Sequence, residues 1–291
     1  MNNLPIYDIL DEIKTTLNSK STLILEAPPG AGKSTVVPIS LLNESWLGNK
    51  IIIMLEPRRV AARMVAVQMA KLLGEEVGQS VGYQVKMESC YSKQTKLLVV
   101  TEAILVRKLQ SDQALEDVAM VIFDEFHERS IHTDLSLALC LQVQELLRPD
   151  LKLLIMSATL DSNELTNLLG KIPVINSKGK IYDVENIYLE TNIKQPDSKS
   201  INTLLLNITL KAIKEDEGDI LVFLAGAKEI LRLQNLLEES LKEKNIEILP
   251  LYSTLSKEKQ DKAISKSNKR KIILSTNIAQ TSLTIEGVKV V

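Results

Sequence analysis

A nine-residue segment, APPGAGKST at residues 27–35, constrains the fold more than any other part of the chain. It directly follows a short apolar run, residues 21–26, which is typical of a buried strand. A Gly-containing turn between a strand and a helix points backbone N–H groups at a phosphate, and the positive end of the helix adds to the attraction. We therefore expect an α/β fold with a nucleotide phosphate site, in which Lys33 reaches the terminal phosphates and Ser34 binds Mg²⁺. The residues expected to contact the nucleotide are Gly30, Ala31, Gly32, Lys33, Ser34 and Thr35.

Apolar runs and helical stretches alternate through the first part of the chain. Four runs that are apolar almost throughout, as strands buried on both faces are, lie at residues 51–55, 97–100, 119–123 and 151–156. Helical stretches separate them, for example residues 58–73 and 134–147. This alternation predicts a parallel sheet with helices on both faces.

The character of the sequence changes after residue 170, where Pro, Gly and polar residues become frequent. We predict a linker at residues 173–200, with a possible strand at 184–189, between a first domain at 1–172 and a second at 201–291. The second domain is again an α/β unit. Its predicted helices lie at 201–214, 228–243 and 257–265, and its predicted strands at 220–224, 246–251, 272–275 and from 288 onward.

The composition excludes several classes of protein. Lys and Arg number 35 and Asp and Glu 37, and this net charge of −2 excludes a histone-like protein, although not a local nucleic-acid groove. Cys90, Cys140 and two histidines are too few for a structural metal site. No run approaches the roughly 20 apolar residues of a membrane span, and the first residues lack the apolar core of a signal peptide. We expect a cytoplasmic protein without a membrane partner, and a monomer rather than an oligomer.

A second segment, AMVIFDEFHER at residues 119–129, ends an apolar strand in two carboxylates. Asp124 is expected at the carboxyl edge of the sheet, beside the phosphate loop, where it can hold Mg²⁺ through the water shell of the ion. Glu125 is placed to orient or deprotonate an attacking water molecule. Taken alone, these residues are also compatible with an acidic, solvated strand end. Together with the phosphate loop, they favour nucleotide hydrolysis.

The ordered set of motifs resembles the DEAH/RHA group of superfamily 2 helicases, in which DEFH corresponds to the DExH box. Motif I is matched at residues 27–35, and the other matches are EPRRVAAR at 56–63, TEAIL at 101–105, SATL at 157–160, LVFLAG at 221–226 and STNIAQTSLTIEGV at 275–288. The resemblance implies two tandem RecA-like domains, with ATP and Mg²⁺ as cofactors. It further implies ATP hydrolysis coupled to movement along single-stranded RNA or DNA that is bound across both domains.

The resemblance also assigns roles to single residues. Lys33, Asp124, Glu125 and His127 would form the catalytic set, and His127 would also take part in coupling with Ser157 and Thr159. The residues that would contact the nucleic-acid strand are Arg58, Arg59, Thr101, Glu102, Thr276, Asn277 and Thr281. Without the resemblance, the two arginines would be interpreted as solvated charges at the start of a helix. The Thr-Glu pair would then be a helix cap followed by an acidic first turn.

One motif of the family is missing from residues 1–291. No Q-R-x-G-R-x-G-R stretch occurs, and in the family this motif supplies arginines to the γ-phosphate, an effect worth roughly 10³ to 10⁵ in rate. We therefore expect the amino-terminal portion of a helicase, with an incomplete second domain, that binds nucleotide but is impaired in hydrolysis and unwinding. Two alternatives stay open: a nucleotide-dependent RNA-binding module without efficient hydrolysis, and a P-loop kinase or small-molecule ATPase. The last leaves three of the matched motifs unexplained.

Overall fold

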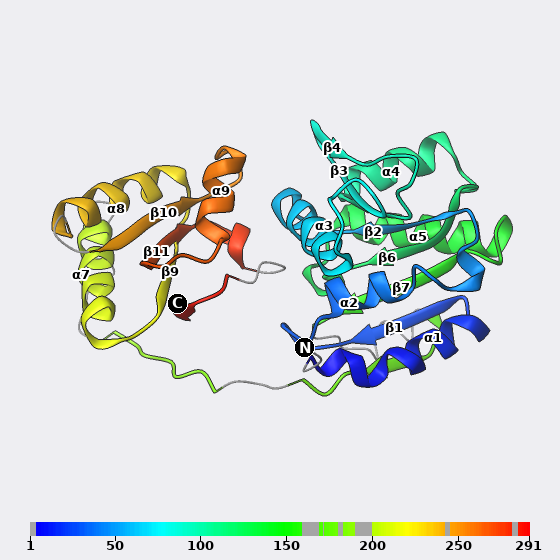
Figure 1. The fold of residues 1–291 in the computed structure, drawn as a ribbon, viewed down its shortest axis with the longest axis horizontal. Coiled ribbons are helices and arrows are strands. Elements are labelled where there is room, and N and C mark those ends of the chain that lie inside the picture. Colours follow the sequence, from blue (N-terminus) through cyan, green and yellow to red (C-terminus); the bar gives the residue numbers. More distant parts are fainter. Residues whose placement is uncertain are drawn as a thin grey trace. The chain divides into compact units, whose positions relative to one another are not determined.

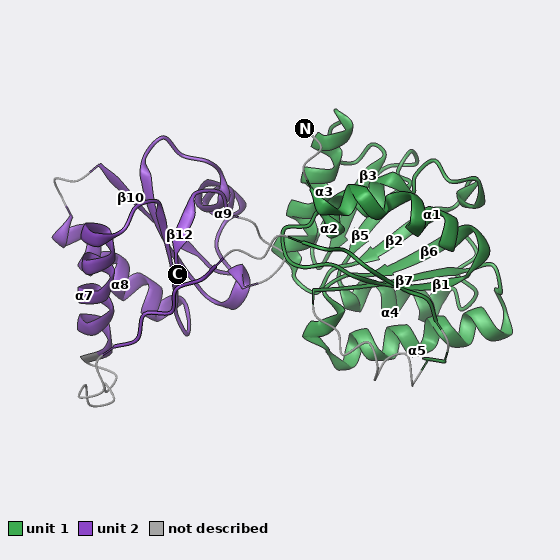
Figure 2. Ribbon diagram, turned by 90° about the horizontal axis from the view of Figure 1, so that it is seen from below, with its two compact units in different colours: residues 1–182 green, residues 183–291 purple. Residues whose placement is uncertain are grey.

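The computed structural model describes residues 4–158, 169–170, 172–179, 183–189, 200–241, 245–280 and 285–291. The chain forms two compact units, residues 1–182 and 183–291 (Figures 1 and 2). Within the described ranges, no helix has both the length and the apolar character needed to cross a membrane.

Unit 1 is built on one eight-stranded sheet in the order β4-β3-β5-β2-β6-β7-β1-β8. All neighbouring strands are parallel except β3 and β4, which pair antiparallel. The strands are β1 (Thr22–Glu26), β2 (Ile51–Leu55), β3 (Val81–Val85), β4 (Glu88–Cys90), β5 (Leu97–Val100), β6 (Val118–Phe123), β7 (Lys152–Ser157) and β8 (Val174–Asn176). The parallel sheet predicted from the alternating pattern is confirmed, and five of its strands start and end within one residue of the predicted positions.

Four short segments differ from the sequence-based expectation. Strands β3 and β4, at one side of the sheet, were not predicted, and β8 lies inside the predicted linker, where it pairs in parallel with β1. Conversely, residues 184–189 have no regular secondary structure, and Val184 and Tyr188 are exposed. A strand requires a hydrogen-bonded neighbour, and no described strand pairs with this segment.

Helices cover both faces of this sheet (Figure 1). Ile52 and Met54 of β2 belong to a core cluster with α1, α2 and α3, whereas Ile53 and Leu55 belong to a cluster with α4 and α5. Successive strand side chains point to opposite faces, so each strand contributes to both clusters. The helical elements are η1 (Pro5–Ile9), α1 (Leu10–Ser19), α2 (Lys33–Ser40), η2 (Ser45–Leu47), α3 (Arg59–Leu73), α4 (Glu102–Ser111), η3 (Phe126–Glu128) and α5 (Ile131–Leu146).

Unit 2 is a smaller α/β unit with a four-stranded parallel sheet in the order β10-β11-β9-β12. In its core, Ile230, Leu233 and Leu237 of α8 pack with Ile272 and Leu274 of β11. The elements are α7 (Ser200–Glu215), β9 (Asp219–Phe223), α8 (Ala227–Ser240), β10 (Ile246–Leu251), α9 (Lys257–Ile264), β11 (Arg270–Ser275), η4 (Asn277–Ala279) and β12 (Val288–Val290). The helices and strands predicted for this part of the sequence are present, with ends shifted by at most three residues.

Candidate nucleotide-binding site

The loop between β1 and α2 has the backbone of a phosphate-binding turn. Gly30 and Gly32 have φ of +76° and +96°, in the left-handed region that favours glycine. A Cβ at Gly32 would lie 3.0 Å from Leu4 Cδ1 and 3.1 Å from Ile6 Cγ2, so the amino-terminal segment packs directly on the loop. A Cβ at Gly30 would meet no atom within 4 Å. The loop is therefore packed on one side and borders open space on the other.

Lys33, the first residue of α2, forms a buried ion pair with Glu125. Lys33 Nζ lies 2.7 Å from Glu125 Oε1, and both side chains are about 5% exposed. Burial lowers the pKa of Lys33, but the carboxylates of Asp124, Glu125 and Glu56 outweigh it and raise the pKa above the usual value. The lysine is therefore an ammonium group. The structure thus brings the first and second predicted motifs into direct contact.

Asp124 follows β6 and is 1% exposed. Its Oδ1 accepts a hydrogen bond from the Glu125 N–H at 2.8 Å, whereas its buried Oδ2 has no hydrogen-bond partner among the described residues. Burial raises the pKa of Asp124 to about 6, and Lys33 and the Ser34 hydroxyl act in the opposite direction. A buried carboxylate oxygen without a partner, close to a hydroxyl, is a donor set that fits a divalent cation. Ser34 and Asp124 are therefore suited to hold Mg²⁺.

The carboxyl end of β7 links the phosphate loop to the segment after β6. The Ala27 N–H donates to the Ser157 carbonyl at 3.0 Å, and the Ala158 N–H donates to His127 Nδ1 at 3.4 Å. The other ring nitrogen, His127 Nε2, lies 3.4 Å from Glu125 Oε2. Ser157 and His127 thus lie between the loop and the carboxylates. Thr159, predicted to act with Ser157, lies outside the described residues.

The residues of the EPRRVAAR segment that are predicted to contact nucleic acid are two arginines at the start of α3. Arg59 is exposed, whereas Arg58 is partly buried and its Nη2 lies 3.1 Å from Glu128 Oε2. Arg58 is therefore already engaged with the second motif.

The Thr-Glu pair of the TEAIL segment, also predicted to contact nucleic acid, lies at the start of α4. Thr101 is buried. Glu102 Oε1 accepts hydrogen bonds from the Ser130 and Thr133 hydroxyls, both at 2.6 Å. Glu102 thus ties α4 to the first turn of α5.

The predicted strand contacts of unit 2 follow β11. Thr276 is partly buried and donates its N–H to the Leu251 carbonyl at 3.2 Å, and Asn277 is exposed. Thr281 lies outside the described residues. Thr276 and Asn277 are at the carboxyl edge of the second sheet, and their contact with a strand stays a prediction.

Two functional candidates were missed by the sequence analysis. Glu56 is fully buried directly after β2, and its charge helps to raise the pKa of Lys33. It could have been found, because it ends an apolar strand in a carboxylate just as Asp124 does. Glu128, the partner of Arg58, has no such signal, because an acidic residue in a loop is usually solvated.

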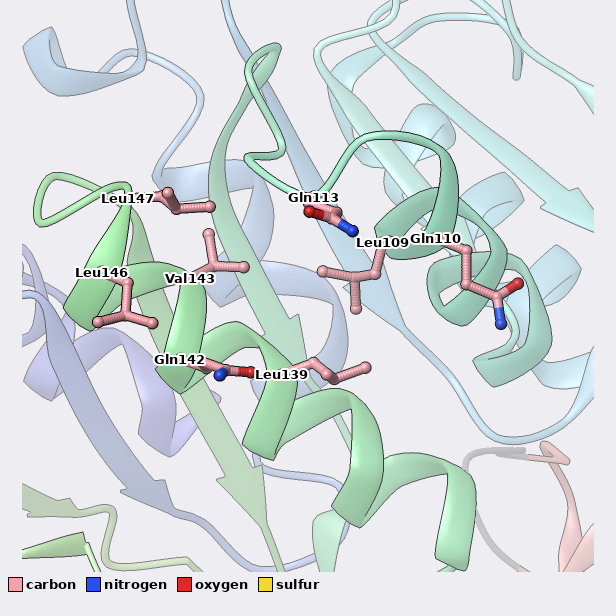
Figure 3. Close-up of a pocket in the computed structure, with 8 residues that line it drawn as sticks. All are labelled: Leu109, Gln110, Gln113, Leu139, Gln142, Val143, Leu146 and Leu147. Atoms are coloured by element: carbon pink, nitrogen blue, oxygen red, sulfur yellow. The ribbon is translucent and has the colours of Figure 1, made fainter.

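A pocket of about 460 Å³ lies elsewhere in unit 1, between α4 and α5 (Figure 3). Aliphatic residues, among them Leu109 and Val143, and three glutamines line it. It contains no charged side chain and none of the predicted site residues. It therefore lacks the groups that bind phosphate, and the loop before α2 is the candidate nucleotide site.

Comparison with known proteins identifies the family of the chain. Residues 9–168 match the family model for the DEAD/DEAH box helicase, and residues 200–291 match that for the helicase conserved C-terminal domain. The chain is 44% identical over its whole length to the ATP-dependent RNA helicase HrpB of Escherichia coli, and 37% identical over 99% of its length to the ATP-dependent RNA helicase HrpA of Borreliella burgdorferi. It spans 36% and 35% of the lengths of these two relatives.

Solved structures agree as well. A crystal structure of the Escherichia coli DEAH/RHA helicase HrpB matches 98% of this chain at 44% identity with a TM-score of 0.88, and the match covers 36% of that protein. A second crystal structure, of the Escherichia coli DExH-box NTPase HrpB, matches 99% of this chain at 45% identity with a TM-score of 0.78, and covers 35% of that protein. The prediction of two tandem RecA-like domains is confirmed.

Proposed function

Because this chain belongs to the DEAD/DEAH box helicase family, within the DEAH/RHA group, we propose that it binds ATP at the phosphate loop and couples ATP hydrolysis to movement along single-stranded RNA. We choose RNA because both relatives, HrpB and HrpA, are named ATP-dependent RNA helicases. Single-stranded DNA presents the same phosphate backbone and is the competing ligand to test.

The observation that carries this proposal is the buried contact between Lys33 and Glu125. In this ion pair, the ammonium group of Lys33 is bound to the Glu125 carboxylate that would act as the base. A γ-phosphate bound in the loop would compete for Lys33, because its oxygens carry more negative charge than one carboxylate. Lys33 would then bind the phosphate, and Glu125 would be released to accept a proton from the attacking water molecule. ATP binding would thus activate its own base.

Ser34 and Asp124 would hold Mg²⁺, which supplies charge neutralisation at the phosphates when it is bound. His127 Nε2, close to Glu125 Oε2, would donate a hydrogen bond and orient the released carboxylate. Ser157 would hold the start of the phosphate loop through the carbonyl that accepts from Ala27. The chain's own groups thereby position the nucleotide, the metal and the water molecule.

The polypeptide of residues 1–291 should bind nucleotide but hydrolyse it slowly, because it contains no arginine motif of the kind that contacts the γ-phosphate in this family. The same observation favours a second function, a nucleotide-dependent RNA-binding module that does not hydrolyse efficiently.

The test is a titration with a fluorescent ATP analogue, followed by ATPase rates with and without single-stranded RNA. We expect Mg²⁺-dependent binding and slow hydrolysis. Failure to bind nucleotide would contradict both functions. RNA-stimulated ATP turnover comparable with that of a full-length relative would exclude an RNA-binding module without efficient hydrolysis. It would also contradict the slow hydrolysis expected of residues 1–291.

A further inference from the structure

The segment after Asp124 is held by side chains from the two motifs that are proposed to contact the strand. Arg58, directly before α3, pairs with Glu128 of η3 at 3.1 Å. Glu102, the first residue of α4, binds the hydroxyls of Ser130 and Thr133. The segment thus connects the strand-binding side of unit 1 to the catalytic carboxylates.

Glu128 is also connected to Glu125 through the backbone. The Glu128 N–H donates to the Glu125 carbonyl at 2.9 Å. Glu125 and Arg129, at the two ends of this turn, have φ of +50° and +43°. Such values are unfavourable for residues other than glycine and persist only where surrounding contacts enforce them. Release of the Glu128 side chain from Arg58 would therefore alter the conformation that holds Glu125.

The contact between Arg58 and Glu128 is accessible to a ligand. The Arg58 and Glu128 side chains are 20% and 22% exposed, and Arg59 beside them is exposed. A phosphate can reach Arg58 there, and guanidinium groups bind phosphate in a bidentate manner. Ion pairs with this degree of solvent contact are weak and can be exchanged for a better acceptor.

We infer that Glu128 is a positioning residue that couples strand binding to Glu125: a strand phosphate takes Arg58 from Glu128, and the turn that carries Glu125 relaxes. This inference rests on the proposed function. Glu128, the last glutamate of the DEFHER segment, would compete with the phosphates of the strand for Arg58. If this exchange of Arg58 between Glu128 and phosphate alters the turn that carries Glu125, strand binding must also change the affinity for nucleotide, because coupling between two binding sites is reciprocal.

The test is a double-mutant cycle in nucleotide-free protein, with a short fluorescein-labelled oligouridylate as the probe. Glu128→Gln removes the competing charge, and we expect about two- to fivefold tighter binding of the oligonucleotide, the range of a partly exposed ion pair. In the Arg58→Ala background, the same substitution should have no effect, because the group for which Glu128 competes is gone. Glu128→Ala is a second variant with the same expectation.

Asp134→Asn is the matched control. It breaks another exposed ion pair of the same segment, that between Arg129 and Asp134 at 2.9 Å, and removes the same charge without freeing Arg58. We expect it to leave oligonucleotide affinity unchanged. A gain that also appears in Asp134→Asn, or that persists in the Arg58→Ala background, is a general electrostatic effect and overturns the inference.

The second readout is the factor by which saturating oligouridylate changes the affinity for a fluorescent ATP analogue. This factor should move towards one in Glu128→Gln, which a purely structural role would not produce. If the unmodified chain binds oligouridylate and Glu128→Gln binds no more tightly, the inference alone fails. If the unmodified chain binds no oligouridylate in any nucleotide state, the proposed function and the inference fall together.

Discussion

Lys33 and Glu125, 92 positions apart in the sequence, form a buried ion pair in which their charged atoms are 2.7 Å apart. In the proposed function, this ion pair joins the cation that would bind phosphate to the carboxylate that would act as the base. Substitution of either partner therefore has two effects, one on the ligand and one on the partner left behind.

Lys33→Ala should weaken Mg-ATP binding by at least about tenfold, because the variant has no ammonium group to make a charge-assisted hydrogen bond to phosphate. It should also lower the melting temperature, since Glu125 is left buried without its cation. Titration with a fluorescent ATP analogue and thermal unfolding measure the two effects. Unchanged affinity would mean that the phosphates bind elsewhere.

Glu125→Gln should leave Mg-ATP affinity nearly unchanged and lower hydrolysis by about 10²- to 10⁴-fold, as expected when a general base is removed. The glutamine can still accept a hydrogen bond from Lys33 but cannot take a proton. Single-turnover hydrolysis, measured beside nucleotide binding, separates the two properties. Hydrolysis at the rate of the unmodified chain would exclude Glu125 as the base.

Gly32→Ala should destabilise unit 1 more than Gly30→Ala does. Both positions have positive φ, so each substitution carries a conformational cost of about 1–2 kcal/mol. Only at Gly32 would the new methyl group also press on the side chains of Leu4, Ile6 and Val36, at 3.0–3.3 Å. The melting temperatures of the two variants, at about 2–4 °C per kcal/mol, provide the comparison. Equal values would contradict the packing of the amino-terminal segment on the loop.

The two cysteines should differ in reactivity. Burial raises the pKa of the Cys140 thiol to about 12, and its side chain is inaccessible in α5, whereas Cys90 is only partly buried. Since a raised pKa keeps the thiol neutral, Cys140 should stay unreactive towards a chromogenic disulfide reagent between about pH 7 and 9, where an ordinary thiol becomes more reactive. Cys140→Ala should retain the fast reaction, and Cys90→Ser should lose it. A fast reaction in Cys90→Ser would show that α5 opens in the native state.

The features that could be predicted from the sequence are those that depend on residues close together in the chain. The phosphate loop, and Asp124 at the end of an apolar strand, are contiguous signals, and the order of strands and helices follows from periodicity. The pairing of Arg58 with Glu128, 70 residues away, depends on the order of strands in the sheet and on side-chain conformation. Strands such as β8, with three residues, carry too little pattern to be told from a linker.

The strand order of unit 1 also sets the distance between the phosphate loop and the carboxylates that follow β6. β7 lies between β6, which ends at Asp124 and Glu125, and β1, which leads into the phosphate loop. The two halves of the site are therefore set apart by two inter-strand spacings, or roughly 9.5 Å. The strand that carries Ser157 thus works as a spacer, and the long side chain of Lys33 spans the gap that it sets.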